Sequence, residues 1–457
     1  MDERERALRR AEELALAYLA GVADRPVGAA ANASDIAAQL AGPLPNAGID
    51  PTTVIEEMAA SFDPGLVSSA GPRYFGFVVG GALPAAAAAD WLVSAWNQNS
   101  NLHAMSPAAA AVELVAGAWL LDLFGLPADA SVGFPTGAAL GTTVGLAAGR
   151  HAVLSRVGWD VEARGLYGAP EIAVVVGDEV HSTLLAGLQY LGLGRERILR
   201  LPTDDQGRIR PETLPSVLDP VVPTIVAIQA GNVNSGAFDP AIEIADALAD
   251  HPNHWLHVDG AFGLWAAASP SLRHLVRGYD RADSWASDAH KWLNAGYDGG
   301  FVAVRDPKAH RAAMTAVAAP YLMQNHAQRD NWEYVLDSSR RARGFVVYAA
   351  LRSLGRSGVI AMIDRCCALA RRMAEQLAAT PGIEILNEVV LNQVLVRIGD
   401  SDDRTRGVMA SVQAGGEAWM GGTVWHGKFA IRISVSNWST TEADADRTVA
   451  AIRKAAA

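Results

Sequence analysis

Short apolar stretches alternate with helical patterns from Gly133 onward, and this alternation restricts the fold more than any other feature of the chain. The stretches are mostly β-branched and end at turn residues, as buried strands do. They are Ile172–Gly177, Thr224–Gln229, Trp255–Val258, Ser284–Ala286 and Gly300–Val304. Helical patterns separate them, at Gly137–Ala148, Ser182–Leu191 and Pro240–Asp250. The pattern predicts an α/β fold: a mostly parallel central sheet with helices on both faces, which binds ligands at the carboxyl ends of its strands.

The flanking segments predict two smaller parts. An amphipathic helix at Asp2–Ala23 and a short helix near Ile49–Phe62, after the start signal Asp50-Pro51, predict an N-terminal helical arm over residues 1–85. The large α/β domain then covers 86–344. A helix-rich stretch over Ser339–Ala379 leads into a different pattern of strand, helix, strand and helix. These last elements are Val389–Arg397, Gly407–Gly415, Ala430–Val435 and Thr441–Ala456, and they predict a small C-terminal α+β domain over 345–457.

Composition excludes several classes of protein. The 457 residues are 50% hydrophobic and 19% charged, which is globular rather than disordered composition. A net charge of −11 argues against a nucleic-acid partner. Cys366 and Cys367 are adjacent and so are poorly placed to bridge. We find no signal peptide and no uninterrupted apolar stretch of about 18 residues, and expect a cytoplasmic protein with a small-molecule substrate and no membrane partner.

Two segments place a lysine and an acid after predicted strands. The strand at Ser284–Ala286 runs into a turn that carries Lys291, and a neutral amine there could form a Schiff base. The strand at Trp255–Val258 ends in Asp259, 32 residues before Lys291 and about one crossover unit away. Each feature alone is more typical of an ordinary turn. Together they predict two side chains at the same sheet edge.

Two further segments complete the pattern. Small residues from Gly133 to Thr143 open a helix, whose free backbone N–H groups bind phosphate well. His181 follows the strand at Ile172–Gly177 and opens the next helix, where it can stack on a planar ring or transfer protons. Alone, the first is more typical of close helix packing and the second of helix capping. In this order, the four features meet the requirements of pyridoxal phosphate.

On these residues the chain resembles the group II pyridoxal-phosphate decarboxylases, which have the aspartate aminotransferase fold, fold type I. This family includes the aromatic-L-amino-acid, glutamate and diaminobutyrate decarboxylases. The most specific parts are His257-Val258-Asp259 with Ala261, and Ala282-Asp283-Ser284 leading to His290-Lys291-Trp292. The resemblance extends from Pro72-Arg73-Tyr74 to Arg432-Ile433-Ser434. It implies an L-amino acid decarboxylase that releases an amine and CO₂.

The resemblance also implies roles for individual residues. Lys291 is similar to the lysine that forms the Schiff base, Asp259 to the partner of the pyridine nitrogen, Ala261 to the small residue against the ring, and His181 to the imidazole stacked on it. The full set that we expect to bind the cofactor is Lys291, Asp259, Ala261, His181, Ala138, Ala139, His290, Asn232 and Asp288. The expected catalytic residues are Lys291, His181, Asp259 and Tyr334.

For the substrate, Arg432 resembles the arginine that often holds a carboxylate in this fold. Phe77 and Val78 lie in an apolar segment, which favours an apolar or aromatic substrate side chain. Family members are homodimers with the active site at the subunit interface, and we expect the same here.

Three departures from the family pattern affect the reaction. Asp288-Ala289 replaces an Asn-Pro type pair before His290, and an aspartate beside a phosphate would repel it unless protonated or turned away. Ala139-Leu140 stands where a glutamate element is usual. Asn331 stands at the position of a mobile-loop tyrosine that protonates the substrate, with Tyr334 and Tyr321 nearby but offset. Family members with altered loops form aldehydes oxidatively.

Other functions remain open from the sequence. A transaminase or a carbon–carbon lyase could use the same cofactor and the same lysine. A non-catalytic scaffold with this fold is an alternative of another class. His251, His254 and His257 have a spacing that could suit a metal, but Pro252 and the following strand break the helix that this would need. We therefore expect no metal.

Overall fold

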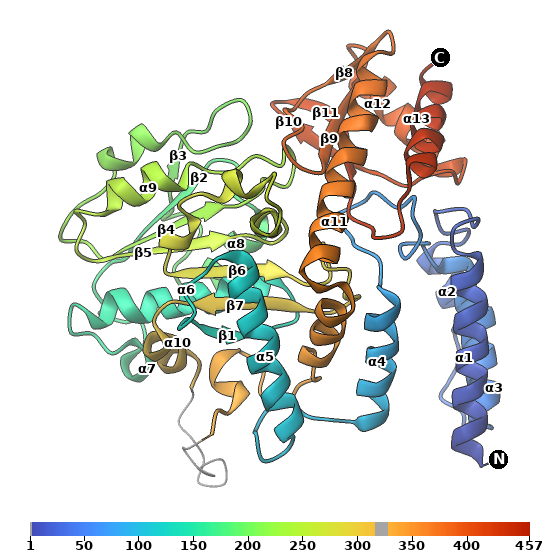
Figure 1. Cartoon of the computed structure of the whole chain (residues 1–457), viewed down its shortest axis with the longest axis horizontal. Coiled ribbons are helices and arrows are strands. Elements are labelled where there is room, and N and C mark those ends of the chain that lie inside the picture. The colour runs from blue at the N-terminus through green and yellow to red at the C-terminus, as the bar shows by residue number, and fades with distance from the viewer. Residues whose placement is uncertain (1, 316–327) are drawn as a thin grey trace. The chain divides into compact units, whose positions relative to one another are not determined.

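The structure is a computed structural model, and it describes residues 2–315 and 328–457 (Figure 1). The chain divides into two compact units. The first contains Met1–Gly81, Arg372–Leu386 and Leu395–Ala457. The second contains Ala82–Arg371 and Asn387–Val394. The three domains expected from the sequence stay a prediction.

A seven-stranded sheet forms the centre of the second unit, in the order β1-β7-β6-β5-β4-β2-β3 (Figure 1). Its strands are β1 (Ser131–Gly133), β2 (Ala173–Gly177), β3 (Leu199–Leu201), β4 (Thr224–Gln229), β5 (His254–Asp259), β6 (Ser284–Asp288) and β7 (Gly300–Val304). The pairs from β3 through β2, β4 and β5 to β6 are parallel, and β7 is antiparallel to both β6 and β1. The predicted α/β fold with a mostly parallel sheet is confirmed.

The observed strands differ from the predicted ones mainly in their ends. β1 and β3 have three residues each, too few for a recognisable period, and were not predicted. β6 continues two residues past its expected end, to Asp288. It does so because Asp288 still pairs with Gly300 of β7, and its N–H donates to the Ala261 carbonyl at 2.9 Å.

Helices connect these strands. In the second unit they are α4 (Pro84–Trp96), α5 (Pro107–Phe124), α6 (Ala138–Ser155), α7 (Val161–Arg164), α8 (Ser182–Tyr190), α9 (Ala241–Leu248) and α10 (Pro307–Met314). Short 3₁₀ turns include η3 (Gly263–Ala268) and η7 (Asn331–Tyr334). α11 (Gly344–Ala378) begins in the second unit and is interrupted at Gly355, whose φ is 60°.

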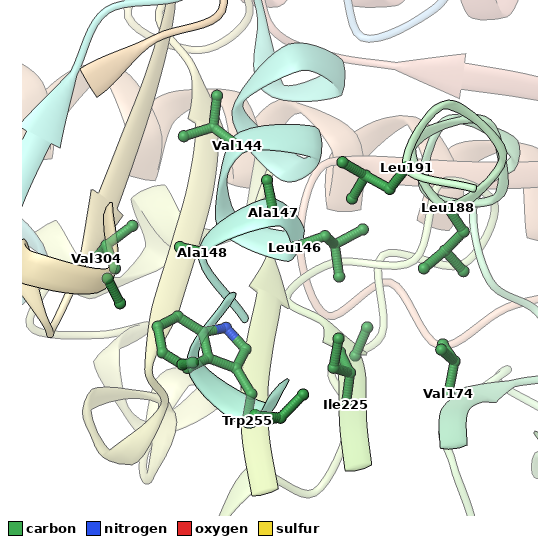
Figure 2. Close-up of a cluster of buried hydrophobic side chains, with 14 of the residues drawn as sticks. Val144, Leu146, Ala147, Ala148, Val174, Leu188, Leu191, Ile225, Trp255 and Val304 are labelled. Atoms are coloured by element: carbon green, nitrogen blue, oxygen red, sulfur yellow. The ribbon is translucent and has the colours of Figure 1, made fainter. Parts of the chain in front are cut away.

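Strand alternation shows that α6 and α5 cover opposite faces of the sheet. In β7, Val302 and Val304 join the apolar cluster around α6, which also contains Trp255 and Ile225 (Figure 2). Phe301, the residue before Val302, packs instead against Phe124 of α5. Because neighbouring residues of a strand point to opposite faces, the helices lie on opposite sides.

α5 and α11 are long and apolar enough to cross a membrane by length and composition alone. The expectation of no such stretch counted only uninterrupted apolar runs, whereas both helices contain a few charged residues. In α5 one of them, Glu113, is fully buried and pairs with Arg340 of the same unit at 2.9 Å. Half of α5 is buried within the protein, and this packing explains its apolar composition.

The first unit contains helices and a smaller sheet. Its helices are α1 (Glu3–Gly21), α2 (Ala33–Leu40), α3 (Pro51–Phe62), α12 (Asp402–Ala414) and α13 (Glu442–Ala456). The second sheet has the order β10-β11-β9-β8, with β8 (Ile383–Ile385), β9 (Gln393–Ile398), β10 (Gly421–Trp425) and β11 (Lys428–Ser434). β9 begins four residues later than predicted, because residues 387–392 bend and join the sheet only from Gln393.

Glycines let α6 approach the sheet closely. Gly141, Gly145 and Gly149 recur every fourth residue on one side of α6. A Cβ at Gly145 would lie 2.7 Å from His257 Nδ1, and one at Gly149 would lie 2.7 Å from Trp255 Cδ1. Any larger residue would therefore push the helix away from β5.

We expect Gly149→Ala to destabilise the protein by about 1–3 kcal/mol, because the added methyl group overlaps the rigid Trp255 ring. Gly407→Ala is the matched control, since Gly407 is an exposed residue of α12 with no atom within 4 Å of its added Cβ. There the higher helix propensity of alanine should add about 0.5–1 kcal/mol. Denaturant unfolding measures both. Stabilisation by both variants would contradict the close packing of α6.

His257 lies under α6 as a buried neutral base. Ser284 Oγ accepts from the Trp255 indole at 2.9 Å, so its hydroxyl donates to His257 Nδ1 at 2.8 Å. Burial lowers the pKa of His257 from 6.5 to about 3. Between these pH values His257 is protonated in the unfolded chain but neutral in the folded protein. The free energy of unfolding therefore falls as the pH drops from 6.5 towards 3.

We expect His257→Gln to reduce the slope of the free energy of unfolding against pH by about 1 kcal/mol per pH unit, because one fewer proton is taken up on unfolding. Urea unfolding at a series of pH values from about 4 to 6 measures the slope. His274→Gln, at an exposed position, is the control and should leave the slope unchanged. An unchanged slope in His257→Gln would show that His257 is not a buried neutral base.

Candidate active site

Three strands end in polar residues on the face that α6 covers. Gln229, Asp259 and Asp288 are the last residues of β4, β5 and β6. His257 is two residues before Asp259, and Ala286 is two residues before Asp288. Both His257 and Ala286 lie against the glycines of α6. Since side chains two apart in a strand share a face, the polar ends point to the side where α6 begins. Register pairs Gln229 with Asp259.

A cavity of about 160 Å³ opens at this edge. All its lining residues belong to the second unit. They are Gly137, Ala138, Ala139, His181, Thr183, Gln229, Gly231, Val233, Asp259, Ala261, Phe262, Asp288, His290 and Lys291. The structure thus brings together eight of the nine residues expected to bind the cofactor.

Lys291 and Asp288 form the central contact of the cavity. Lys291 Nζ lies 2.9 Å from Asp288 Oδ2, an ion pair between residues three apart in sequence. Asp288 Oδ1 accepts a 2.5 Å hydrogen bond from the backbone N–H of Ala138, the first residue of α6. Because Gly137 before it has no side chain to cap the helix, the N–H groups at the start of α6 are available to an anion.

His290 lies next to this pair. Its ring stacks on Tyr297, with centroids 4.4 Å apart, and its Nδ1 accepts from the Gly299 N–H at 3.2 Å. Burial lowers the pKa of His290. The neutral ring therefore carries its proton on Nε2, which lies 3.4 Å from Asp288 Oδ1.

Asp259 and His181 also line the cavity. Asp259 Oδ1 accepts from the Ala261 N–H at 3.2 Å, and this local turn directs the carboxylate at the strand end. His181 precedes α8, where its Nδ1 accepts from the Thr183 N–H at 3.3 Å and contacts Thr183 Oγ1 at 2.7 Å. His181 is thus a helix cap and a cavity residue at once.

Two predicted residues of the second unit lie outside the cavity lining. Asn232 shapes a turn, accepting from the N–H groups of Asn234 and Ser235 at 2.8 and 3.2 Å. Tyr334 packs under Arg329, whose guanidinium lies 3.8 Å from the ring centroid. Neither side chain lines the cavity that contains Lys291.

Asn331, which stands at the position of the family's mobile-loop tyrosine, also points away from solvent. Asn331 is buried, and its Nδ2 donates to Ser100 Oγ at 3.3 Å and to the Ala109 carbonyl at 3.5 Å. Tyr321 lies outside the described residues. Phe77, Val78 and Arg432 belong to the first unit, and their roles towards a substrate stay predictions.

Six lining residues are absent from the predicted set: Gly137, Thr183, Gln229, Gly231, Val233 and Phe262. Gln229 carried a usable signal, because it ends a buried strand one crossover before Asp259. Its Nε2 donates to the Glu179 carbonyl at 3.1 Å, which holds the side chain at the edge. Gly137 and Thr183 stand at the starts of α6 and α8, and Gly231, Val233 and Phe262 lie in loops after strand ends, where no periodic pattern marks them.

The three histidines considered for a metal have other partners. His251 Nε2 lies 2.9 Å from the Asp219 carbonyl, His254 Nδ1 lies 2.7 Å from the His251 carbonyl, and His257 is bonded to Ser284. Over residues 2–315 and 328–457, no three His, Cys, Asp or Glu side chains gather as a metal site would require. These rings therefore act in the structure of the protein.

The residues present fit pyridoxal phosphate. Asp288 already places a carboxylate on the first N–H of α6, which shows that this helix start accepts an anionic oxygen. The cavity also holds one amine, that of Lys291, and one carboxylate away from the helix start, that of Asp259. An anion cradle, an amine and a strand-end acid are the groups that this cofactor needs.

Comparison with known proteins agrees with this geometry. Residues 37–398 match the model of the pyridoxal-dependent decarboxylase conserved domain. Tryptophan decarboxylase 1 of Oryza sativa subsp. japonica is 28% identical over 84% of this chain and 80% of its own length. A crystal structure of Oryza sativa TDC with PLP and tryptamine superposes with a TM-score of 0.92 at 25% identity, covering 100% of this chain and 98% of that one.

The names of two further relatives give a different substrate or a different product. The acidic amino acid decarboxylase GADL1 of Xenopus tropicalis is 28% identical over 70% of this chain and 64% of its own length. The 4-hydroxyphenylacetaldehyde synthase of Rhodiola rosea is 25% identical over 94% and 90%. Similar scaffolds therefore serve different side chains and different products.

Proposed function

This chain belongs to the family of pyridoxal-dependent decarboxylases, and we propose that its active site is the cavity around Lys291. It is a pyridoxal-phosphate-dependent amino acid decarboxylase. The observation that carries the proposed location is the convergence of Lys291, Asp259 and the start of α6 on one cavity.

When bound, pyridoxal phosphate supplies an aldehyde that captures amines and a pyridinium ring that accepts the electron pair left after loss of CO₂. Lys291 Nζ would be the amine that holds the aldehyde carbon. Asp259 would keep a proton on the ring nitrogen, since a carboxylate stabilises a nearby cation. The N–H groups of Ala138 and Ala139 would hold the phosphate, with His290 Nε2–H as a further donor.

His181 would stack on the ring and Ala261 would leave space for it. The Thr183 contact at Nδ1 would fix the orientation of the His181 ring. With substrate and cofactor bound, Lys291 would be a base within the cavity that could return a proton to the substrate.

We favour an L-amino acid with an apolar or aromatic side chain. Phe77 is 59% exposed and lies against Trp419, with ring centroids 5.4 Å apart, in the first unit. Both Phe77 and Val78 have positive φ, 53° and 59°, a costly backbone for such residues and one that is commonest at functional sites. The rice relative, a tryptophan decarboxylase, supports the same class of substrate. Arg432 would hold the substrate carboxylate.

A second product is favoured by one observation. Asn331 stands where the family carries its tyrosine, and its side chain is bonded inward to Ser100 and Ala109. Slow return of the proton would give O₂ time to oxidise the substrate carbon, and the product would then be an aldehyde. The similarity to an aldehyde synthase supports this alternative.

We propose that the protein is a cytoplasmic homodimer. Both cysteines are buried thiols, in keeping with a reducing compartment. Large apolar side chains are exposed along one stretch of the second unit: Trp91, Leu92 and Trp96 of α4, and Leu114, Val115 and Trp119 of α5. A patch of this kind is typical of an interface between subunits.

A panel of L-amino acids, incubated in air with protein and pyridoxal phosphate, tests the reaction. Mass spectrometry should detect an amine and CO₂, with aromatic amino acids consumed fastest and acidic ones slowest. Lys291→Ala should abolish product formation, whereas Lys308→Ala, at an exposed position of α10, should not.

The products separate the alternatives. An aldehyde with ammonia and consumption of O₂ would identify the oxidative reaction. Conversion of a keto acid would identify a transaminase, and equal rates with and without Lys291 would disprove the proposed site.

Val115→Asp should convert the dimer to a monomer, because it places a charge within the apolar patch of α5. Val221→Asp is the control, since Val221 is 82% exposed and lies outside the patch. Analytical ultracentrifugation gives the mass of each variant. A Val115→Asp protein with the mass of the wild type would show that α5 is not the interface.

A further inference from the structure

We propose that Asp288 competes with the cofactor phosphate for the start of α6, and thereby sets how tightly the chain holds pyridoxal phosphate. The inference rests on the active site proposed above. Asp288 would then act in the opposite sense to an ordinary binding residue, because its side chain lowers the affinity of the cavity for the phosphate.

The geometry places the carboxylate on the donor that a phosphate needs. Asp288 Oδ1 accepts from the Ala138 N–H at 2.5 Å, and Asp288 is only 3% exposed. A Cβ built on Gly137 would lie 3.1 Å from this same oxygen, so the space beside the N–H is filled. Because one N–H makes one strong hydrogen bond, a phosphate oxygen can use Ala138 only if Asp288 Oδ1 moves away.

The charges of the cavity act in the same direction. Among the described lining residues, Lys291 is the only lysine or arginine, against the two carboxylates of Asp259 and Asp288. Burial lowers the pKa of His290, so that this ring adds no compensating charge near neutral pH. A phosphate group brings about −1.5 to −2 further charges. Lys291 is already paired with Asp288 at 2.9 Å.

An asparagine at position 288 would remove this conflict without changing the shape of the side chain. Its amide could donate to a phosphate oxygen instead of repelling it. Asp288→Asn should therefore bind pyridoxal phosphate about ten-fold more tightly or better, since like charges a few ångströms apart cost at least the roughly 1.4 kcal/mol that corresponds to ten-fold.

Loss of Asp288 also removes the partner of Lys291, which by itself changes how readily the amine takes up an aldehyde. Pyridoxal, which has the aldehyde but no phosphate, corrects for this effect. The test is the ratio of two dissociation constants, pyridoxal over pyridoxal phosphate, measured by absorbance titration of the apoprotein. We expect this ratio to rise about ten-fold in Asp288→Asn, and in the same direction in Asp288→Ser.

Asp178→Asn is the matched control, because Asp178 is an exposed carboxylate just after β2 and outside the cavity lining. Its ratio should equal that of the wild type. An unchanged or lower ratio in both Asp288 variants would overturn the proposal and show that Asp288 helps to hold the phosphate.

Failure of the active site itself would look different. If Lys291→Ala bound pyridoxal phosphate with the same spectrum and affinity as the wild type, the proposed site would be wrong. If Lys291 is required but the ratio does not rise in the Asp288 variants, only the competition is wrong.

Discussion

The close approach of α6 to β5 and β6 is the contact on which the site depends. Gly141 and Gly145 let the helix lie directly against Ala286 and His257, two residues before Asp288 and Asp259. The start of the helix thereby meets the ends of the strands at one edge. A side chain at those glycines would separate the phosphate cradle from the acid and the lysine, so packing and chemistry are fixed by the same residues.

Electrostatics explains why the site is built from backbone donors. Lys291 is the cationic side chain among the described lining residues, and Asp288 already pairs with it. Backbone N–H groups at a helix start attract an anion without adding a buried charge that needs its own partner. The cost is that any carboxylate nearby competes for the same donors, and Asp288 is such a carboxylate.

Much of this arrangement could be predicted from the sequence, where patterns are periodic. From buried strands with turn residues at their ends, we predicted that Asp259 and Lys291 share one sheet edge, and from helix starts we selected Ala138 and His181. All four residues line the same cavity. Asn232 and Tyr334 lie in turns, where spacing from a strand says little about direction, and neither lines the cavity. β1 and β3 were too short to show a period. Phe77, Val78 and Arg432 come from the other compact unit, and only tertiary structure can relate them to the cavity.

The most direct test of the account is to find which amine holds the cofactor. Borohydride reduction of the protein with bound pyridoxal phosphate traps the cofactor on that amine, and peptide mass spectrometry then locates it. The account predicts the label on Lys291 at close to one per chain. A label on Lys308, Lys428 or Lys454 instead, or spread evenly over all of them, would contradict it.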